Sequence, residues 1–359
     1  MTLNPVLFLF YPILQESSSP FLYFVKFFTI LRFFCCFCAD LPKISCHLFF
    51  SLTISVILYL TNNRAAHFAG RSYANNGHAA ARTALMSLKG GDTMLWDMHM
   101  HSRFSGDSDA PQDAMIDAAI AKGLGGICFT DHLDMDYPGG LDLFLLDLPG
   151  YTASVLAQRQ RYKDRIPVRL GLELGLQPQL SEIYADILAQ YPFDFVIGSS
   201  HVVHGKDPYY PEYHEGRSET VCYREYFESV LENIRAFDGF DVYGHIDYVV
   251  RYGPNRNKYY SYAQYADVID EILTLLIKKG KGIELNTGGF KYGLGHPNPT
   301  EAIIARYHEL GGEIITIGAD AHAPTHVAYA FEKVPAILKE AGFRYFTVFQ
   351  ERKPEFVKL

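Results

Sequence analysis

Two histidines separated by one residue are the first candidate metal ligands that we consider in this chain. The stretch DMHMHSRFSGDSD, which starts at Asp97, contains His99 and His101 and then Asp107 and Asp109. In a β-strand, the side chains of residues i and i+2 point to the same face. Two imidazoles on one face, followed by carboxylates, indicate a metal site, although the pair alone would also fit a polar loop.

Six later segments carry similar groups, each at or just beyond the end of an expected strand. They read FTDH, GLELG, IGSSH, YGHID, IELNT and TIGADAH. The side chains that they supply are Asp131, His132, Glu173, His201, His245, Asp247, Glu284, Asn286, Asp320 and His322, and His204 follows three residues after His201. A single histidine after a strand is more often a hydrogen-bonded loop residue. The prediction of a metal site therefore depends on the conjunction of all seven segments.

The elements that must position these groups alternate between strand and helix. Short apolar runs predict strands at 96–100, 126–130, 169–173, 195–199, 241–244, 282–286 and 314–318, with a late one at 345–349. Helical periods fall between them, at 113–122, 218–237, 261–279 and 300–310. This order is typical of a parallel sheet covered by helices, and about seven repeats favour a closed barrel over an open sheet. In a barrel the carboxyl ends of the strands share one face, so the polar groups would meet there.

The composition of this cluster restricts the metal and the reaction. Imidazole and carboxylate ligands without thiolate suit Zn, Mn or Fe(II) better than Ca. About nine ligands are too many for one ion, whereas bridging carboxylates would let them hold two or three. Such clusters activate water and stabilise the attacking and leaving oxygens of a phosphate ester.

The motifs DMHMHS…SGDSD, TDH, GLELG, SSH, GHIDYVVRYGP and GADAH resemble the PHP (polymerase and histidinol phosphatase) superfamily. The resemblance covers Met94 to about Leu359, and KDPYYPEYHEGRS and GGEIITIGADAH are similar to its bacterial monofunctional histidinol-phosphatases. It implies a distorted (β/α)7 barrel of the TIM type with a trinuclear metal centre. It also implies a phosphoric monoester hydrolase that converts L-histidinol phosphate to L-histidinol and phosphate late in histidine biosynthesis.

The resemblance also implies a set of metal ligands, with Glu173 as a bridging carboxylate. The set is His99, His101, Asp107, His132, Glu173, His201, His245, Asp320 and His322. Asp109 remains an alternative to Asp107. The expected cofactors are two or three divalent ions of Zn, Mn or Fe.

Hydrolysis also requires a proton donor and cations for the phosphate. Asp320 and His204 are the candidate acids. Arginine binds phosphate through two parallel hydrogen bonds and stays charged, and the candidates are Arg217, Arg224 and Arg251. Arg251 is favoured because its VVRYGP turn lies directly beyond a ligand strand.

The imidazole and amine of the substrate would need aromatic walls and an acidic partner. The candidate walls are Tyr209, Tyr210 and Tyr213, in a proline-bounded loop after the fourth strand. Asp247 and Glu284 are candidate amine partners, although Asp247 could equally brace His245 from behind.

The charge and the cysteine content disfavour a nucleic-acid-binding protein and a protein built on disulfides. Residues 1–93 carry 7 Lys/Arg against 3 Asp/Glu and the whole chain 32 against 40, which leaves 25 against 37 for residues 94–359. Such an acidic body disfavours nucleic acid as a partner. Its two cysteines, Cys128 and Cys222, make no disulfide framework, so a cytoplasmic enzyme is expected.

Residues 1–93 differ in character from the remainder, and the expected division is an extension at 1–93 and an enzyme domain at 94–359. Apolar runs at 21–38 and 48–60 are each marginal for crossing a bilayer, and 61–93 is linker-like. The extension could be a membrane anchor, a targeting segment or sequence wrongly translated ahead of Met94. Membrane contact is expected only if residues 1–60 are genuine.

Three other functions compete with histidinol phosphate hydrolysis. Another PHP phosphoesterase, acting on a different small monoester or nucleotide, would use the same ligands. A binding protein with a dead site should have lost ligands, and none is missing. An amidohydrolase barrel also begins with His-x-His, but it bridges its metals with lysine where this chain has Glu173.

Overall fold

The structure is a computed structural model that describes residues 94–139 and 142–359 of the chain. The predicted extension at 1–93, with its two apolar runs and the boundary at Met94, lies outside the described residues. Within the described ranges, no helix has the length and apolar character needed to cross a membrane.

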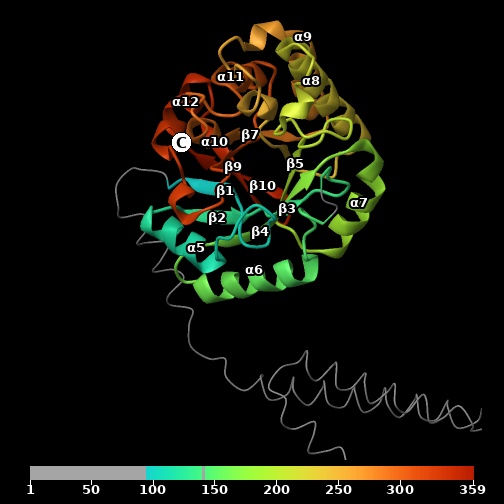
Figure 1. The fold of residues 1–359 in the computed structure, drawn as a ribbon. Coiled ribbons are helices and arrows are strands. Elements are labelled where there is room, and N and C mark those ends of the chain that lie inside the picture. The colour runs from blue at the N-terminus through green and yellow to red at the C-terminus, as the bar shows by residue number, and fades with distance from the viewer. Residues whose placement is uncertain (1–93, 140–141) are drawn as a thin grey trace, which may run out of the picture. The chain divides into compact units, whose positions relative to one another are not determined.

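Seven parallel strands form a barrel-like sheet at the centre of the fold (Figure 1). In their order around the sheet they are β1 (Trp96–Met100), β2 (Gly126–Phe129), β4 (Val168–Gly175), β5 (Phe195–Ser199), β6 (Val242–Tyr243), β7 (Gly282–Asn286) and β8 (Ile315–Gly318). The strands are apolar and almost wholly buried, as expected where helices cover the outside of a parallel sheet. The short strand β3 (His132–Leu133) pairs with the far end of β4.

The sheet closes between its first strand and the segment after its last. The His101 N–H donates to the Ala321 carbonyl at 2.9 Å, and the Asp320 N–H donates to the His99 carbonyl at 2.9 Å. Closure therefore places the His-x-His motif of β1 directly beside the Asp-x-His motif that follows β8.

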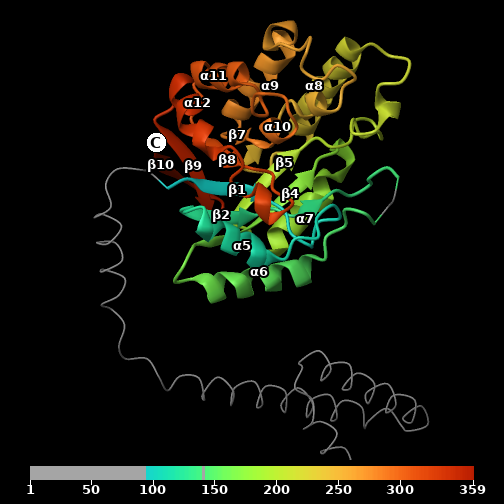
Figure 2. The same cartoon turned by 60° about the vertical axis from the view of Figure 1, so that its left-hand side comes forward.

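Helices surround the strands on the outside (Figures 1 and 2). They are α5 (Gln112–Ala121), α6 (Leu148–Tyr162), α7 (Ser181–Gln190), α8 (Glu219–Ala236), α9 (Ala266–Lys278), α11 (Glu301–Glu309) and α12 (Val334–Glu340), while the short helix α10 (Gly288–Lys291) follows the carboxyl end of β7. Polar side chains begin two of the longer ones. The Ser218 hydroxyl accepts from the Val221 N–H at the start of α8, and the Asp147 carboxylate accepts from the Gly150 N–H at the start of α6.

The predicted barrel architecture is confirmed, with local differences. All seven predicted barrel strands are present, and the late strand at 345–349 forms instead an antiparallel hairpin, β9 (Tyr345–Gln350) with β10 (Lys353–Lys358). Helices α6, α7, α10 and α12 and the strands β3 and β10 were not predicted.

Candidate metal centre

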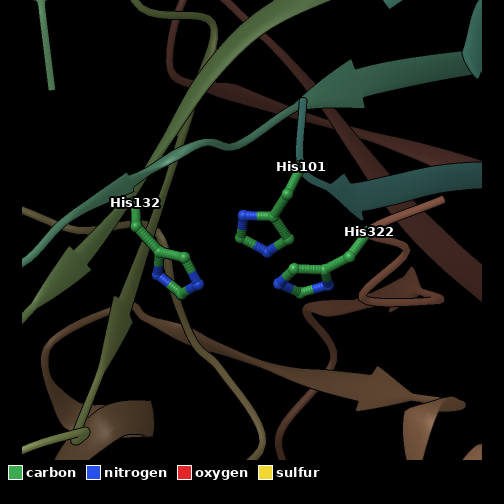
Figure 3. Close-up of side chains that lie close together, drawn as sticks. All are labelled: His101, His132 and His322. Carbon is green, nitrogen blue, oxygen red and sulfur yellow. The ribbon is translucent and has the colours of Figure 1, made fainter. Parts of the chain in front are cut away.

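Histidines from three separate strand ends converge at the carboxyl face of the barrel. His101 follows β1, His132 begins β3 and His322 follows β8, and their rings approach one another in Figure 3. One nitrogen from each ring lies within 4.8 Å of the others. The His101 ring stacks at 4.2 Å on both His132 and His322. Imidazole nitrogens at this spacing can share a metal ion.

Glu173, on β4, lies at the centre of a second group and uses both carboxylate oxygens. Its Oε2 is 3.1 Å from His99 Nε2 and 3.1 Å from His132 Nδ1. Its Oε1 is 3.1 Å from His245 Nε2 and 3.4 Å from His201 Nε2. A carboxylate with different histidines on its two oxygens has the geometry of a bridge between metal ions, which supports the role that the family resemblance implies.

Asp320 completes the cluster from the end of β8. Its Oδ1 lies 3.4 Å from His101 Nε2 and 3.8 Å from His99 Nε2. Its backbone has φ 53, in the left-handed region that few side chains other than Gly, Asn and Asp adopt. Backbone strain of this kind is typical of functional positions, where the surrounding structure holds it in place.

The geometry favours Asp107 over Asp109 as the remaining carboxylate ligand. Asp107 Oδ2 lies 2.8 Å from His322 Nε2 and 3.7 Å from His132 Nε2. Both acids are exposed, but within residues 94–139 and 142–359 Asp109 forms no ion pair with a histidine. The two residues lie on one loop, so its path determines which of them faces the cluster.

Three of the histidines are oriented from behind by a polar side chain. Glu284 Oε1 lies 2.6 Å from His99 Nδ1, and Asp134 Oδ2 lies 2.6 Å from His201 Nδ1. The Ser105 hydroxyl lies 3.1 Å from His101 Nδ1. Such partners fix the ring and leave its other nitrogen free for a metal.

A glycine on β8 leaves the room that His99 and Glu284 need. A Cβ at Gly318 would lie 2.3 Å from Glu284 Oε1 and 2.4 Å from the His99 Cβ. Any larger residue there would displace the pair.

Electrostatic coupling within the cluster is strong. Burial by itself would raise the pKa of Glu173, but His99, His132 and His201 lower it well below its usual range. Burial lowers the pKa of His132, but Glu173 and Asp107 outweigh it and raise the pKa to about 9. Protons on these imidazoles thus compensate the buried carboxylates where metal ions would otherwise do so.

The donor set fits divalent metal ions. His132 Nδ1 and His245 Nδ1 are buried atoms without a hydrogen-bond partner, and burial lowers the pKa of His245. His99 Nε2 and His101 Nε2 are 3.0 Å apart. Buried, closely spaced nitrogen lone pairs are costly unless a proton or a metal ion lies between them.

Arg251 is the one predicted phosphate ligand that reaches the cluster. It is buried in the 3-10 helix Tyr248–Arg251 (η3), and its Nη1 donates to Asp320 Oδ2 at 2.9 Å. Asn298 and Asn286 accept its other hydrogen bonds, at 2.9 and 3.1 Å. Three directed bonds fix the guanidinium beside the candidate ligand Asp320.

Lys291 is a second cation at the same place, which sequence reasoning missed. It ends the short helix α10 directly after β7, and its Nζ donates to the Asp320 carbonyl at 2.9 Å. Its position in NTGGFK, just after a strand whose end carries polar groups, was an available signal.

The other predicted site residues contact different partners. Arg217 pairs with Glu225, and Arg224 pairs with Asp267 at 2.9 Å. His204 is exposed, and its Nε2 lies 3.0 Å from Glu232 on α8. The structure therefore does not support phosphate binding by these two arginines or proton donation by His204. Each is drawn to a carboxylate on the helices instead.

The two predicted partners of the substrate amine, Asp247 and Glu284, already form hydrogen bonds with other groups of the protein. Asp247 accepts from Asn298 Nδ2 at 2.6 Å and from the Thr300 N–H at 3.1 Å. Glu284 accepts from the His245 N–H at 3.1 Å while it orients His99. Both carboxylates hold the framework of the site.

Of the three tyrosines predicted as aromatic walls, two lie at the surface. Tyr209 and Tyr210 are exposed, and the Tyr209 ring lies 5.2 Å from Tyr252. Tyr213 is buried and donates its hydroxyl to the Cys222 carbonyl. Tyr213 thus packs in the core and is no wall of the site.

The chain is similar to one protein family and to several histidinol-phosphatases. The model of the family described as PHP domain matches residues 97–288. A histidinol-phosphatase of Lactococcus lactis is 33% identical over 258 residues, covering 72% of this chain and 95% of that protein. A protein of Clostridium acetobutylicum named "Probable histidinol-phosphatase" is 31% identical, covering 72% of this chain and 98% of its own length.

A solved structure supports both the fold and the chemistry. It is the crystal structure of histidinol phosphate phosphatase from Lactococcus lactis complexed with zinc, L-histidinol and phosphate. It matches with a TM-score of 0.69 and 32% identity, covering 73% of this chain and 98% of the other.

Proposed function

The chain belongs to the PHP family, and from that premise we propose that it is a histidinol-phosphatase, which hydrolyses L-histidinol phosphate to L-histidinol and phosphate in histidine biosynthesis. The observation that carries this function is the similarity to the Lactococcus lactis enzyme, which extends over nearly all of that protein. The cluster of histidines and carboxylates at the barrel end supports it independently.

Two or three divalent ions of Zn, Mn or Fe would be held by the cluster. Zinc is favoured by the zinc complex of the similar Lactococcus lactis structure. When bound, such ions supply a nucleophilic hydroxide near neutral pH and neutralise charge on the phosphoryl oxygens. The residues that would hold them are His99, His101, Asp107, His132, Glu173, His201, His245, Asp320 and His322.

The protein's own groups position the ester and move its protons. Arg251 and Lys291 place two positive charges beside Asp320, where they can attract and orient the phosphate. Hydrolysis forms a new P–O bond from water and breaks the ester P–O bond, so the leaving alkoxide must gain a proton. Burial would raise the pKa of Asp320, but His99 and Arg251 hold it well below its usual range. When the hydroxide forms, an ionised Asp320 can take up the proton that the water loses, and it can then pass this proton to the leaving oxygen.

We also propose that the enzyme is cytoplasmic. Its substrate is a small phosphorylated metabolite, and Cys128 and Cys222 are both free and buried. Unpaired cysteines are usual in reducing compartments, which supports the cytoplasmic location predicted from the sequence.

Phosphate release from a panel of esters tests this function. The metal-loaded enzyme should show its highest kcat/KM with L-histidinol phosphate, and lower values with nucleotides, sugar phosphates and p-nitrophenyl phosphate. Equal or higher kcat/KM with another ester would assign the chain to a different phosphoesterase of the same family.

Removing the guanidinium of Arg251 should weaken phosphate binding. For Arg251→Lys, which keeps the charge but loses the planar fork, we expect the KM to rise at least about tenfold and inhibition by inorganic phosphate to weaken. Arg224→Lys is the matched control, because its partner Asp267 lies on the outer helices. An unchanged KM and unchanged phosphate inhibition in Arg251→Lys would remove Arg251 from the phosphate site.

A further inference from the structure

Asp131, in the TDH segment, is a buried carboxylate that is not one of the candidate metal ligands. It lies between β2 and β3, immediately before the candidate ligand His132, and it is fully buried. Its Oδ1 accepts the Ser102 N–H at 2.7 Å and the Ser105 N–H at 3.1 Å. Its Oδ2 accepts the Ser102 hydroxyl at 3.0 Å. Asp131 thus fixes the loop that follows β1 at two of its backbone groups.

The Ser105 hydroxyl connects Asp131 to two candidate ligands. Its Oγ lies 3.0 Å from Asp131 Oδ1 and 3.1 Å from His101 Nδ1. The same Oγ accepts the backbone N–H of His132 at 3.0 Å. A serine hydroxyl has one proton to donate and two lone pairs that accept. Three partners therefore use all of its hydrogen-bonding capacity.

The chemistry of the three partners determines the direction of each hydrogen bond. The Asp131 carboxylate can only accept, so the proton of the Ser105 hydroxyl points toward it. The backbone N–H of His132 can only donate, and it uses one lone pair of Oγ. The second lone pair then requires a proton on His101 Nδ1. If the hydroxyl donated to His101 instead, two buried oxygens would lie 3.0 Å apart with no proton between them, which is costly.

A proton on Nδ1 leaves the Nε2 lone pair of His101 free. This Nε2 lies 3.4 Å from Glu173 Oε2, 3.4 Å from Asp320 Oδ1 and 3.0 Å from His99 Nε2. Without a metal ion, the two carboxylates favour a proton on Nε2, and a metal ion can bind only the unprotonated nitrogen. The Ser105 hydroxyl opposes this competing tautomer.

We propose that Asp131 is a positioning residue of the metal centre, which acts through the Ser105 hydroxyl to hold His101 with its proton on Nδ1 and its Nε2 lone pair toward the metal ions. This role rests on the proposed metal-dependent hydrolase function. The same hydroxyl holds the backbone of His132, so one buried carboxylate fixes ligands from two segments of the barrel. Such support behind the ligands orients them before the metal ion binds.

Zinc affinity, measured by competition with a chelator, tests this role. Ser105→Ala removes the acceptor of the His101 proton, and we expect its zinc affinity to be at least about tenfold weaker than that of Ser102→Ala. Ser102→Ala is the matched control, because the Ser102 hydroxyl is also buried and also donates to Asp131. Within the described ranges, it forms no hydrogen bond with a histidine. Asp131→Asn should resemble Ser105→Ala, because an amide is a weaker acceptor and frees the hydroxyl proton for His101 Nδ1.

A purely structural role of the two hydroxyls predicts the same loss in both serine variants. Equal zinc affinity in Ser105→Ala and Ser102→Ala would therefore overturn the proposal. The tautomer is measured directly by NMR of the zinc-loaded wild-type protein with isotope-labelled histidine rings. We expect the His101 proton on Nδ1, and a proton on Nε2 would also overturn the proposal. This spectrum decides if a variant does not fold.

Neither measurement uses the substrate. A wild-type protein that binds zinc but does not hydrolyse L-histidinol phosphate would disprove the proposed function. The zinc comparison and the spectrum would still decide the role of Asp131, so the two failures can be told apart.

Discussion

Glu173 is the residue on which the metal centre depends most directly. Its two carboxylate oxygens face histidines from β1, β3 and the loops after β5 and β6. No other side chain of the described cluster contacts so many candidate ligands. A single buried carboxylate can in this way hold two metal ions at a fixed separation, which is what phosphate ester hydrolysis by a metal cluster requires.

The neighbouring acids Asp107 and Asp109 should differ sharply in their effect on metal content. Asp107→Asn removes a carboxylate 2.8 Å from His322, so we expect at least about tenfold weaker metal affinity and a similar loss of phosphate release. Asp109→Asn should match the wild type. Metal analysis after dialysis, joined to the activity assay, measures both. Metal loss in Asp109→Asn alone would reverse the assignment.

Metal uptake should release protons and strengthen as the pH rises. In the metal-free protein, Glu173 and Asp107 outweigh burial and raise the pKa of His132 from 6.5 to about 9. The stabilisation from this proton is fully present below the unfolded pKa of about 6.5 and is lost as the pH rises through about 9. A metal ion must displace the same proton.

Thermal unfolding and zinc titration between about pH 7 and about pH 9 measure this coupling. The metal-free protein should lose stability over this range, while its apparent zinc affinity rises. Zinc affinity that stays constant with pH would show that His132 enters the reaction already neutral.

At the scale of elements, Asp97 connects the first and last strands of the barrel. Its carboxylate accepts the Ala319 N–H at 3.0 Å and the Ala328 N–H at 2.9 Å. It also accepts the His99 N–H at 3.3 Å, on its own strand. The first residue of the opening motif therefore fixes the register between the His-x-His strand and the segment around Asp320.

Asp97→Asn should weaken this closure. The amide places a donor where one of the backbone N–H groups needs an acceptor, and a lost buried hydrogen bond costs about 1–3 kcal/mol. Urea unfolding of the metal-free protein measures this loss. Asp109→Asn, an exposed acid on the following loop, is the control. Equal stability of the two variants would mean that strand pairing alone fixes the register.

At the scale of the whole molecule, every candidate ligand lies within residues 94–359. The PHP domain match covers residues 97–288, and the Lactococcus lactis histidinol-phosphatase matches over 258 residues. The apolar residues of the strands and the surrounding helices form one continuous core. The described barrel thus contains the groups that the proposed reaction needs.

A chain that begins at Met94 should keep the activity of the full chain. We expect the same metal content and a kcat/KM for L-histidinol phosphate within about twofold, because no group used by the proposed reaction is removed. Parallel assays of the two chains measure this. A large loss in the shorter chain would show that residues 1–93 contribute to folding or catalysis.

The barrel and the chemistry of its site could both be predicted from the amino-acid sequence. Apolar runs such as 195–199 and 282–286 are expected to form parallel strands that are covered by helices. The parallel arrangement then brings the strand ends together, so residues as distant as His99 and His322 could be assigned to one face. Residue types at those ends were enough to predict nitrogen and oxygen ligands for divalent metals.

The directions of the longer side chains beyond the strand ends could not be predicted, because they depend on contacts between segments that are distant in the sequence. Arg224, His204 and Arg251 were all predicted as site residues, and all three follow ligand strands. Carboxylates on the outer helices bind Arg224 and His204, whereas two asparagines and Asp320 bind Arg251 in the interior. Lys291 ends the four-residue helix α10, which is too short to show a helical period. Its hydrogen bond to the Asp320 carbonyl joins two segments that are distant in the sequence, and this contact could not be predicted from either segment alone.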